Sequence, residues 1–226
     1  RLNSYRINQN PAYLERVERH AVRLMENSVE VGDASFLPYP FDFAIHGREM
    51  LPAPWYSGMA QGQALSAFTR LYNVTGNETY KDFADRLFAS LTQHKNADDP
   101  NIPWVTQVDT DGYLWFEEYA KGDYADYTYN GHMYAVIGLY EYYLAFENPI
   151  ALDLYQGGMT TIRHYADEIR NPGDISSYCL RHPDVKSASY HEVHIREFRL
   201  FARMTGDTTF TYLADLFRQD YTPPTL

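Results

Sequence analysis

The sequence predicts an all-α protein built from helical hairpins. Apolar residues recur at helical spacing along most of the 226 residues, whereas the alternation of apolar and polar residues that marks strands is scarce. A Thr-Gly-Asn or Thr-Gly-Asp turn stands between two helical segments at two places in the chain. Such a turn ends one helix and caps the next, which makes each pair of helices a hairpin.

The helices follow in order from their capping and turn signals. The first is expected to begin at Pro11, because proline fits the first turn of a helix, and to end near Gly32. The second begins at Ser57, whose hydroxyl is a good N-cap. Turns at residues 75–77, 148–149 and 205–207 divide the rest of the chain into pairs. These signals predict helices over residues 57–73, 78–93, 131–147, 151–170, 190–204 and 208–219.

An internal repeat supports the pairing. The pattern of residues 71–87 recurs over residues 201–217, with the turn motif, an aromatic residue and an alanine at the same spacing. Helical hairpins that repeat around a ring make an α/α toroid, and the loops at one rim of the ring form a cleft. A linear helical solenoid shares this local pattern, but its repeats are shorter and more regular. We therefore expect one domain over residues 1–226, an incomplete α/α toroid.

Composition limits the classes of function. The net charge is −11, with 30 acidic against 19 basic residues, which argues against non-specific binding of nucleic acid. An acidic protein that binds an acidic polymer must do so through a local basic pocket. No run of residues is long and apolar enough for a transmembrane span. Cys179 is the only cysteine, so no internal disulfide is possible and the compartment stays open.

The segment over residues 54–64 combines side chains that an ordinary helix start does not need. Its glycines cost helix stability, about 1 kcal/mol each relative to alanine, and such a cost is tolerated where a backbone must come close to another group. Its glutamines offer uncharged amide donors and acceptors, which suit sugar hydroxyls. The residues concerned are Trp55, Tyr56, Gly58, Gly62, Gln61 and Gln63.

Two long connections, over residues 94–129 and 171–189, contain the other candidates, as functional loops often do. In the first, Glu117 and Glu118 are adjacent carboxylates, and one of them holds its proton more tightly if the site is dry. The alternative is a strand with Glu117 solvated and its aromatic neighbours packed. The Asn-Gly step at Asn130 is first of all a turn signal.

The second connection offers cations and imidazoles. Arg181 can grip a carboxylate with two parallel hydrogen bonds, as a uronic acid requires. His191 and His194 are three residues apart, so they share a helix face, but no third ligand is evident and we expect no metal site there. Ser57, His46 and Cys179 form no convincing nucleophile set.

These segments together resemble the C-terminal catalytic domain of the D-glucuronyl C5-epimerases. That family begins the domain with a signature like residues 54–64. Its Trp-Tyr-Glu-Glu-Tyr segment is similar to Trp-Phe-Glu-Glu-Tyr here, and its Tyr-Asp-Leu-Arg-His to Tyr-Cys-Leu-Arg-His. Its Leu-Asn-Gly-Phe before Ile-Gly-Leu-Tyr is similar to Tyr-Asn-Gly-His before the same helix, and its Asp-Tyr-His-x-x-His-Ile to Ser-Tyr-His-Glu-Val-His-Ile. The segments in this chain are residues 115–119, 178–182, 129–132, 137–140 and 189–195.

The resemblance implies the roles of individual residues. Three tyrosines and a glutamate would be catalytic: Tyr119, Tyr178, Tyr190 and Glu118. The residues expected to bind substrate are Arg181, Asn130, Gln61, Gln63, Trp55, Tyr56, His191 and His182. The departures from the family pattern are Phe116 for Tyr, Cys179 and Ser189 for Asp, and a shorter link between the second and third tyrosines. These departures leave the three tyrosines in place, but they leave open which polymer is recognised.

The function implied is inversion of C5 of D-glucuronate to L-iduronate in a heparosan or heparan-type polysaccharide, without a cofactor. Two of the tyrosines would serve the two sugar faces, with neither face assigned, and Glu118 would orient a tyrosine or take the proton. The alternatives are a polysaccharide lyase acting by β-elimination and a non-catalytic glycan-binding helical module. A glycoside hydrolase fits less well, because it needs two carboxylates facing across the bond.

The resemblance also implies a partner, an oligomeric state and a location. It implies an acidic uronate polysaccharide as the partner, a homodimer, and a secretory or extracytoplasmic location. The family's N-terminal β-rich domains, which include a calcium site, have no counterpart in these residues.

Overall fold

The computed structural model describes residues 2–96, 98–99 and 101–222. The ends of the predicted domain 1–226, and residues 97 and 100 of the predicted connection 94–129, lie outside the described residues.

Helices dominate the described part of the chain, as predicted. Six of the predicted helices begin and end within two residues of their expected bounds, and Leu2–Asn8 adds a helix that the sequence did not reveal. The predicted end near Gly32 is wrong, because α2 stops at Glu26 and the chain then forms a short strand. The helices are α1 (Leu2–Asn8), α2 (Pro11–Glu26), α3 (Gly58–Thr75), α4 (Glu78–Thr92), α5 (Tyr129–Phe146), α6 (Pro149–Ile169), α7 (Ala188–Thr205) and α8 (Thr208–Asp220).

The repeated turn works as its sequence predicts. Gly76 and Gly206 have φ angles of 66° and 72°, in the left-handed region that glycine enters without a steric penalty. The side chains that follow cap the next helix: Asn77 accepts from the backbone N–H of Thr79 at 3.0 Å, and Asp207 from that of Thr209 at 2.8 Å. Each turn therefore ends one helix and starts another, as a hairpin requires.

Three antiparallel hairpins of strands lie among the described residues, and the sequence did not predict them. They pair β1 (Val29–Val31) with β2 (Ala34–Phe36), β3 (Phe43–Ile45) with β4 (Glu49–Leu51), and β5 (Thr106–Val108) with β6 (Leu114–Phe116). Each strand has three residues, which is too short for an alternating pattern to stand out.

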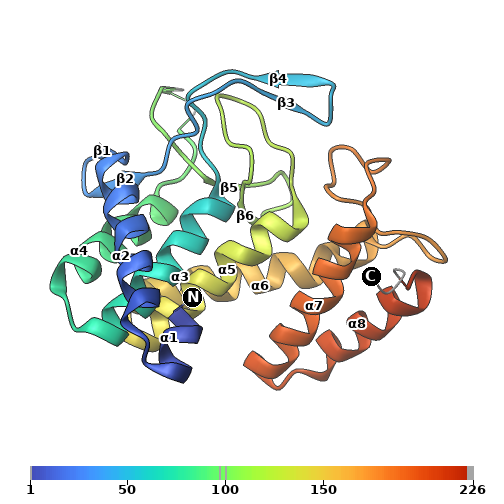
Figure 1. Cartoon of the computed structure of the whole chain (residues 1–226). Helices are drawn as coiled ribbons and strands as arrows, with labels where there is room; N and C mark the ends of the chain where they lie inside the picture. The colour runs from blue at the N-terminus through green and yellow to red at the C-terminus, as the bar shows by residue number, and fades with distance from the viewer. Residues whose placement is uncertain (1, 97, 100, 223–226) are drawn as a thin grey trace.

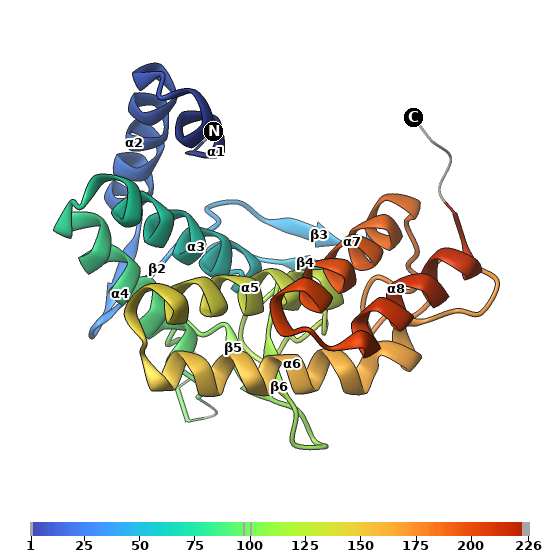
Figure 2. The same ribbon diagram turned by 90° about the horizontal axis from the view of Figure 1, so that it is seen from below.

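The helices pack as neighbouring hairpins, α3 with α4, α5 with α6 and α7 with α8, while α3 also packs along α5. Figure 2 shows the three hairpins side by side, with α6 running beneath α5. The connections that enter α3, α5 and α7 gather at one end of these helices, at the top of Figure 1. No helix among the described residues could cross a bilayer.

Two glycines let α3 and α5 approach with their backbones in contact. A Cβ on Gly62 would collide with Cα of Ala135 and lie 3.0 Å from its nitrogen, and a Cβ on Gly138 would collide with the carbonyl oxygen of Gly62. Because the colliding atoms are backbone, no rotamer change relieves the overlap. This contact explains why α3 contains a glycine at position 62 despite the cost to helix stability.

We expect Gly62→Ala to lower the free energy of unfolding by about 1–3 kcal/mol, as overpacking does in other cores. Gly157→Ala on α6 is the matched control, because its Cβ would meet only side-chain atoms of Leu114, the nearest at 3.1 Å. The leucine can yield, and the helix gains the propensity of alanine. Urea unfolding followed by circular dichroism measures both variants, and equal stabilities would contradict the tight α3–α5 contact.

Candidate active site

The two long connections are joined by backbone hydrogen bonds at the N-terminal end of α5. The N–H of Tyr129 donates to the carbonyl of Tyr178 at 3.2 Å, and the N–H of Leu180 donates to the carbonyl of Tyr127 at 3.2 Å. Residues that are about fifty positions apart in the sequence are thereby held side by side. The reactive groups predicted in the two connections meet because of this pairing.

A glutamate and two tyrosines form a hydrogen-bonded chain. The hydroxyl of Tyr178 donates to Oε1 of Glu118 at 3.1 Å, and the hydroxyls of Tyr178 and Tyr119 are 3.1 Å apart. Glu118 and Tyr178 are almost fully buried, with exposed fractions of 5% and 4%. The structure thus brings together three of the four residues predicted to be catalytic.

The fourth residue, Tyr190, lies beside this chain. Its ring centroid is 4.6 Å from that of Tyr178, with the planes at 58°. Tyr190 belongs to the first turn of α7 and is 39% exposed, whereas Tyr178 is 4% exposed.

The adjacent carboxylates have different partners. Glu117 is fully buried, which excludes the solvated alternative considered from the sequence. It accepts hydrogen bonds from the side chain of Gln107 at 2.8 Å and from the backbone N–H groups of Asp126 at 3.2 Å and Tyr127 at 3.0 Å. Glu117 therefore shapes the loop, whereas Oε2 of Glu118 is buried with no partner among the described residues.

Burial sets the acidity of the site. It raises the pKa of Glu118 to about 7, against the hydrogen bond from Tyr178, which favours the charged form, and with the negative charge of Asp126 adding to the rise. Burial and the charge of Glu118 also raise the pKa of Tyr119 and of Tyr178. Glu118 can therefore change its protonation near neutral pH, a property suited to acid–base chemistry.

Asn130 and Gly131 begin α5 directly against Glu118. A Cβ on Gly131 would collide with Oε2 of Glu118, so only glycine fits there without a shift. Asn130 is 1% exposed, and its Oδ1 is buried with no partner among the described residues. The turn signal read from the sequence is in fact the first turn of a helix at the site.

Gln61, which was predicted to bind substrate, has an internal role instead. Gln61 is fully buried, and its amide bonds the N–H of Leu37, the carbonyl of Ser35 and the hydroxyl of Ser90, at 2.9, 2.9 and 2.5 Å. It therefore ties α3 to the β1–β2 hairpin and α4, and it has no atom left for a sugar. Gln63, two residues on, is exposed on α3.

His191 also faces inward. Its Nε2 lies 2.9 Å from the carbonyl oxygen of Phe217 and its Nδ1 2.9 Å from the hydroxyl of Ser176. The same hydroxyl lies 2.9 Å from Nδ1 of His194. The two imidazoles that share a helix face are thus engaged with protein groups, and His191 is 1% exposed, so it has no surface for substrate.

The predicted aromatic residues support the site from behind. Trp55 is 4% exposed, stacks on Tyr39 with centroids 4.0 Å apart and donates its N–H to the carbonyl of Phe41 at 3.0 Å. Tyr56 is also buried and packs edge-on against Phe36. Trp55 also stacks on Phe43 of β3, with centroids 5.7 Å apart, and so supports the β3–β4 segment, whereas Tyr56 packs in the main core. Neither residue offers an open face to a ligand.

Arg181 lies at the edge of the site. Its guanidinium is 4.7 Å from the ring centre of Tyr124 and makes long contacts, 3.4 Å to the carbonyl of Ala125 and 3.5 Å to Glu49. The side chain is 43% exposed. His182 points inward instead, with Nδ1 2.9 Å from the carboxylate of Asp126.

Asp126 was not predicted to be a site residue, and His46 was considered only as part of a nucleophile set and set aside. The ring of His46 contacts that of Tyr178 edge-on, with centroids 5.5 Å apart, and its Nε2 is 3.2 Å from Asp126. His46 comes from the turn between β3 and β4, which is far from the other site residues in sequence. Only the Ile-His-Gly turn could have pointed to it.

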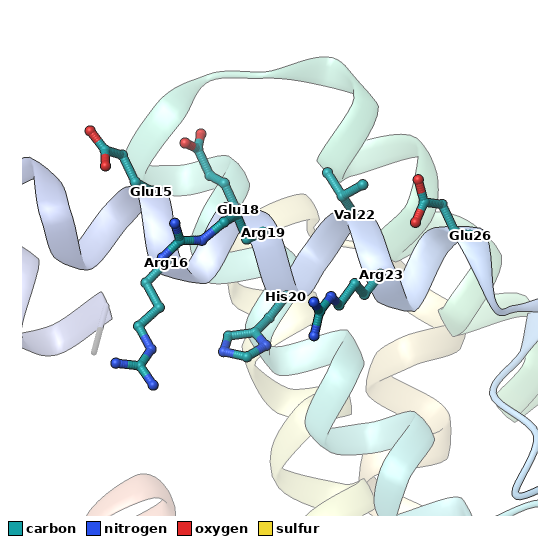
Figure 3. Close-up of a pocket in the computed structure, with 8 residues that line it drawn as sticks. All are labelled: Glu15, Arg16, Glu18, Arg19, His20, Val22, Arg23 and Glu26. Carbon is teal, nitrogen blue, oxygen red and sulfur yellow. The ribbon is translucent and has the colours of Figure 1, made fainter.

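A separate hollow of about 730 Å³ runs along α2 and holds none of the predicted site residues. Figure 3 shows its side chains spreading from one helix instead of converging, with Glu15 and Glu18 pointing away from His20 and Arg23. It therefore lacks the convergent polar groups of a catalytic site.

Solved structures of sugar-processing proteins share the fold. The chain is similar to a cellobiose 2-epimerase of Bacillus thermoamylovorans (TM-score 0.63, 15% identity, 97% of this chain and 57% of that one). It is also similar to a GH76 α-mannanase of Bacteroides thetaiotaomicron (0.59, 12%, 96% and 53%) and to an unsaturated glucuronyl hydrolase of Streptococcus agalactiae (0.57, 16%, 96% and 54%). At these identities the similarity concerns the fold alone, and it supports the predicted α/α toroid.

Comparison of sequences identifies the family more specifically than the shared fold does. Residues 31–219 match the family described as D-glucuronyl C5-epimerase C-terminus. A D-glucuronyl C5-epimerase of Caenorhabditis elegans is 26% identical over 195 residues, which cover 78% of this chain. The match spans only 30% of that relative's length. Since the family match covers most of the chain, the protein belongs to the D-glucuronyl C5-epimerase C-terminal family.

Proposed function

We propose that the protein inverts C5 of D-glucuronate residues to L-iduronate in a heparosan or heparan-type polysaccharide. The observation that carries this proposal is the buried chain of Glu118, Tyr178 and Tyr119, a carboxylate that titrates near neutral pH and is coupled to phenols. Membership of the family supports a uronate polysaccharide as the substrate class.

Epimerisation breaks the C5–H bond next to a carboxylate and forms a new one on the opposite face. The site must take a proton on one face, supply a proton on the other, and stabilise the negative charge that develops on the carboxylate. Each of these tasks has a candidate among the residues described above.

On one face, the ionised Glu118 is the base, acting through Tyr178. The hydroxyl oxygen of Tyr178 receives the C5 proton while its own proton moves along the 3.1 Å hydrogen bond to Glu118. Two hydroxyl oxygens in hydrogen-bond contact leave no room for a carbon between them, so Tyr119 and Tyr178 serve the same sugar face. Tyr119 then orients the hydroxyl of Tyr178.

On the opposite face, the proton donor is Tyr190. It is the remaining tyrosine of the three and the more exposed one, at 39% against 4% for Tyr178, so it can exchange protons with solvent between turnovers. In the reverse reaction the roles of the two faces are exchanged.

The substrate carboxylate is stabilised by Arg181 and by the N-terminus of α5. The contacts of the arginine are long, and its side chain is 43% exposed, so little is lost when the guanidinium turns to a uronate. Helix N-termini carry partial positive charge, and the first turn of α5, which contains Asn130, lies against Glu118 at the site. Gln63 is exposed on α3, and its contact with a neighbouring sugar stays a prediction.

The alternatives from the sequence predict different products. A polysaccharide lyase would use the same base but expel the glycosidic oxygen, giving an unsaturated sugar. A glycan-binding module would bind without breaking the C5–H bond. The homodimer stays a prediction.

We expect the chain to incorporate deuterium at C5 of heparosan in deuterated water and to produce iduronate signals in the NMR spectrum. Glu118→Gln and Tyr178→Phe should each slow the exchange at least about 100-fold, because each removes a step of the proton path. Tyr190→Phe should allow exchange on one face while greatly slowing inversion.

Tyr212→Phe is the matched control, since Tyr212 is 62% exposed on α8, and it should react at the wild-type rate. Undiminished exchange in Tyr178→Phe would refute the proposed base. Exchange together with cleavage of the polysaccharide would identify a lyase. Binding of the polysaccharide without exchange would identify a glycan-binding module.

The rate below neutral pH should follow the ionisation of Glu118. Its pKa is raised to about 7, so the ionised base is lost as the pH falls through that value. We expect kcat/KM to rise tenfold per pH unit up to about pH 7 and then to level off. The groups that face Glu118 are Tyr39, Tyr119, Tyr178 and the already ionised Asp126, whose pKa is lowered by hydrogen bonds despite its burial.

The control for this pH dependence is the residual exchange of Glu118→Gln, which should be nearly independent of pH over the same range. Glu117 also has a pKa raised to about 7 by burial. A slope that persists in Glu118→Gln would therefore assign the titration to Glu117 instead.

A further inference from the structure

Four side chains with metal-binding atoms converge beside the tyrosines. They are His46, Asp126, Cys179 and His182, and their potential ligand atoms all lie within 4.8 Å of one another. Asp126 and Cys179 are fully buried, and the two histidine side chains are 10% and 12% exposed. The proposed proton path uses none of the four.

The two separations that involve sulfur fit the edges of a tetrahedron around zinc. Sγ of Cys179 is 3.7 Å from Nε2 of His46 and 3.7 Å from Nδ1 of His182. Zinc–sulfur and zinc–nitrogen bonds at tetrahedral angles require about 3.6 Å for such an edge. Nε2 of His46 lies 3.2 Å from Oδ2 of Asp126, and Nδ1 of His182 lies 2.9 Å from its Oδ1. One ligating oxygen needs about 3.4 Å to each nitrogen, so the carboxylate must turn to offer a single oxygen to the ion.

We propose that His46, Asp126, Cys179 and His182 bind one Zn²⁺ ion in a closed, structural site. One thiolate, two imidazoles and one carboxylate form a donor set that suits zinc, whereas magnesium and calcium prefer oxygen atoms alone. Binding displaces the thiol proton to solvent. Zn²⁺ with one thiolate, one carboxylate and two neutral imidazoles has no net charge, which is the arrangement that a buried site favours.

Neighbouring groups already orient the ligands. Asp126 accepts hydrogen bonds from the hydroxyls of Tyr124 at 2.9 Å and Thr128 at 2.8 Å, which fix its carboxylate. Nε2 of His182, the ring nitrogen that faces away from the cluster, lies 3.6 Å from Oε1 of Glu49, just beyond hydrogen-bond distance. A carboxylate behind a ligating imidazole is the usual second partner in zinc sites, where it fixes the tautomer.

The ion would join three segments that are remote in sequence. His46 comes from the β3–β4 turn, Asp126 from the connection before α5, and the other two ligands from the connection before α7. The latter two connections carry Tyr119 and Tyr178 and are already paired by backbone hydrogen bonds. Zinc would add the β3–β4 hairpin to this pair and hold it over the tyrosines. The inference does not depend on the proposed reaction.

The test is metal binding by the whole chain. After removal of metal with a chelator and return of Zn²⁺, elemental analysis of dialysed wild type should give one zinc per chain. Co²⁺ in place of Zn²⁺ should give a sulfur-to-cobalt charge-transfer band in the near ultraviolet, together with the intense visible bands of tetrahedral cobalt. This spectrum reports the thiolate ligand directly in the unaltered protein.

Cys179→Ala and His182→Gln should each weaken Zn²⁺ binding at least about 100-fold in a competition with a chromophoric chelator, since even the loss of a supporting residue costs 10–100-fold. His20→Gln, an exposed histidine on α2, is the matched control and should bind like wild type. Circular dichroism verifies that each variant is folded.

Wild type that retains no zinc after dialysis, or a cobalt complex without the sulfur band, would overturn the proposal. Because both measurements use the unaltered chain, they decide the question even if a variant fails to fold. A variant that loses zinc but exchanges the C5 hydrogen at the wild-type rate would show that the reaction does not need the metal site. A variant that keeps zinc but loses the exchange would show that the metal site does not need the proposed proton path.

Discussion

Backbone-to-backbone contact between α3, α5 and the segment after β6 is the constraint on which the rest of the structure depends. Gly62 and Gly138 bring the two helices together, and Gly58 extends the same line of contact to the segment with the carboxylates. The N–H of Gly58 donates to the carbonyl of Glu117 at 2.6 Å, and a Cβ there would lie 2.9 Å from that oxygen. With no side chains between them, these backbones fix the position of Glu118 relative to both helices.

The sequence was most informative where structure is local. Helix bounds follow from caps and turns within a few residues, so Asn77 and Asp207 could be recognised as caps without a fold. The β hairpins could not be predicted, because three-residue strands are held by pairing with their partners and are too short to show an alternating pattern of apolar and polar residues. The end of α2 was misplaced for the same reason.

The site was predictable in part. Glu118, Tyr119 and Tyr178 could be proposed because the motifs around them resemble a family, and the structure brings these side chains into contact. Gln61 and His191 illustrate the limit, since a polar residue beside a motif looks the same in sequence whether it faces a ligand or a buried carbonyl. Only the packing of α4 and α8 reveals that both face inward.

The different environments of Glu117 and Glu118 have a consequence for the evolution of this segment. One carboxylate shapes the loop and its neighbour meets the phenols, although the two differ by a single step along the chain. Inserting or deleting one residue after β6 would therefore move one carboxylate into the environment of the other, and it would also break the contact with Gly58. The tip of the β5–β6 turn, residues 110–112, is exposed on the far side of β6 and can change length more freely, whereas Asp109 is held by hydrogen bonds from Trp115 and Tyr165. Length variation among homologous chains should therefore accumulate in that turn, while the step from β6 to Glu118 keeps a constant length.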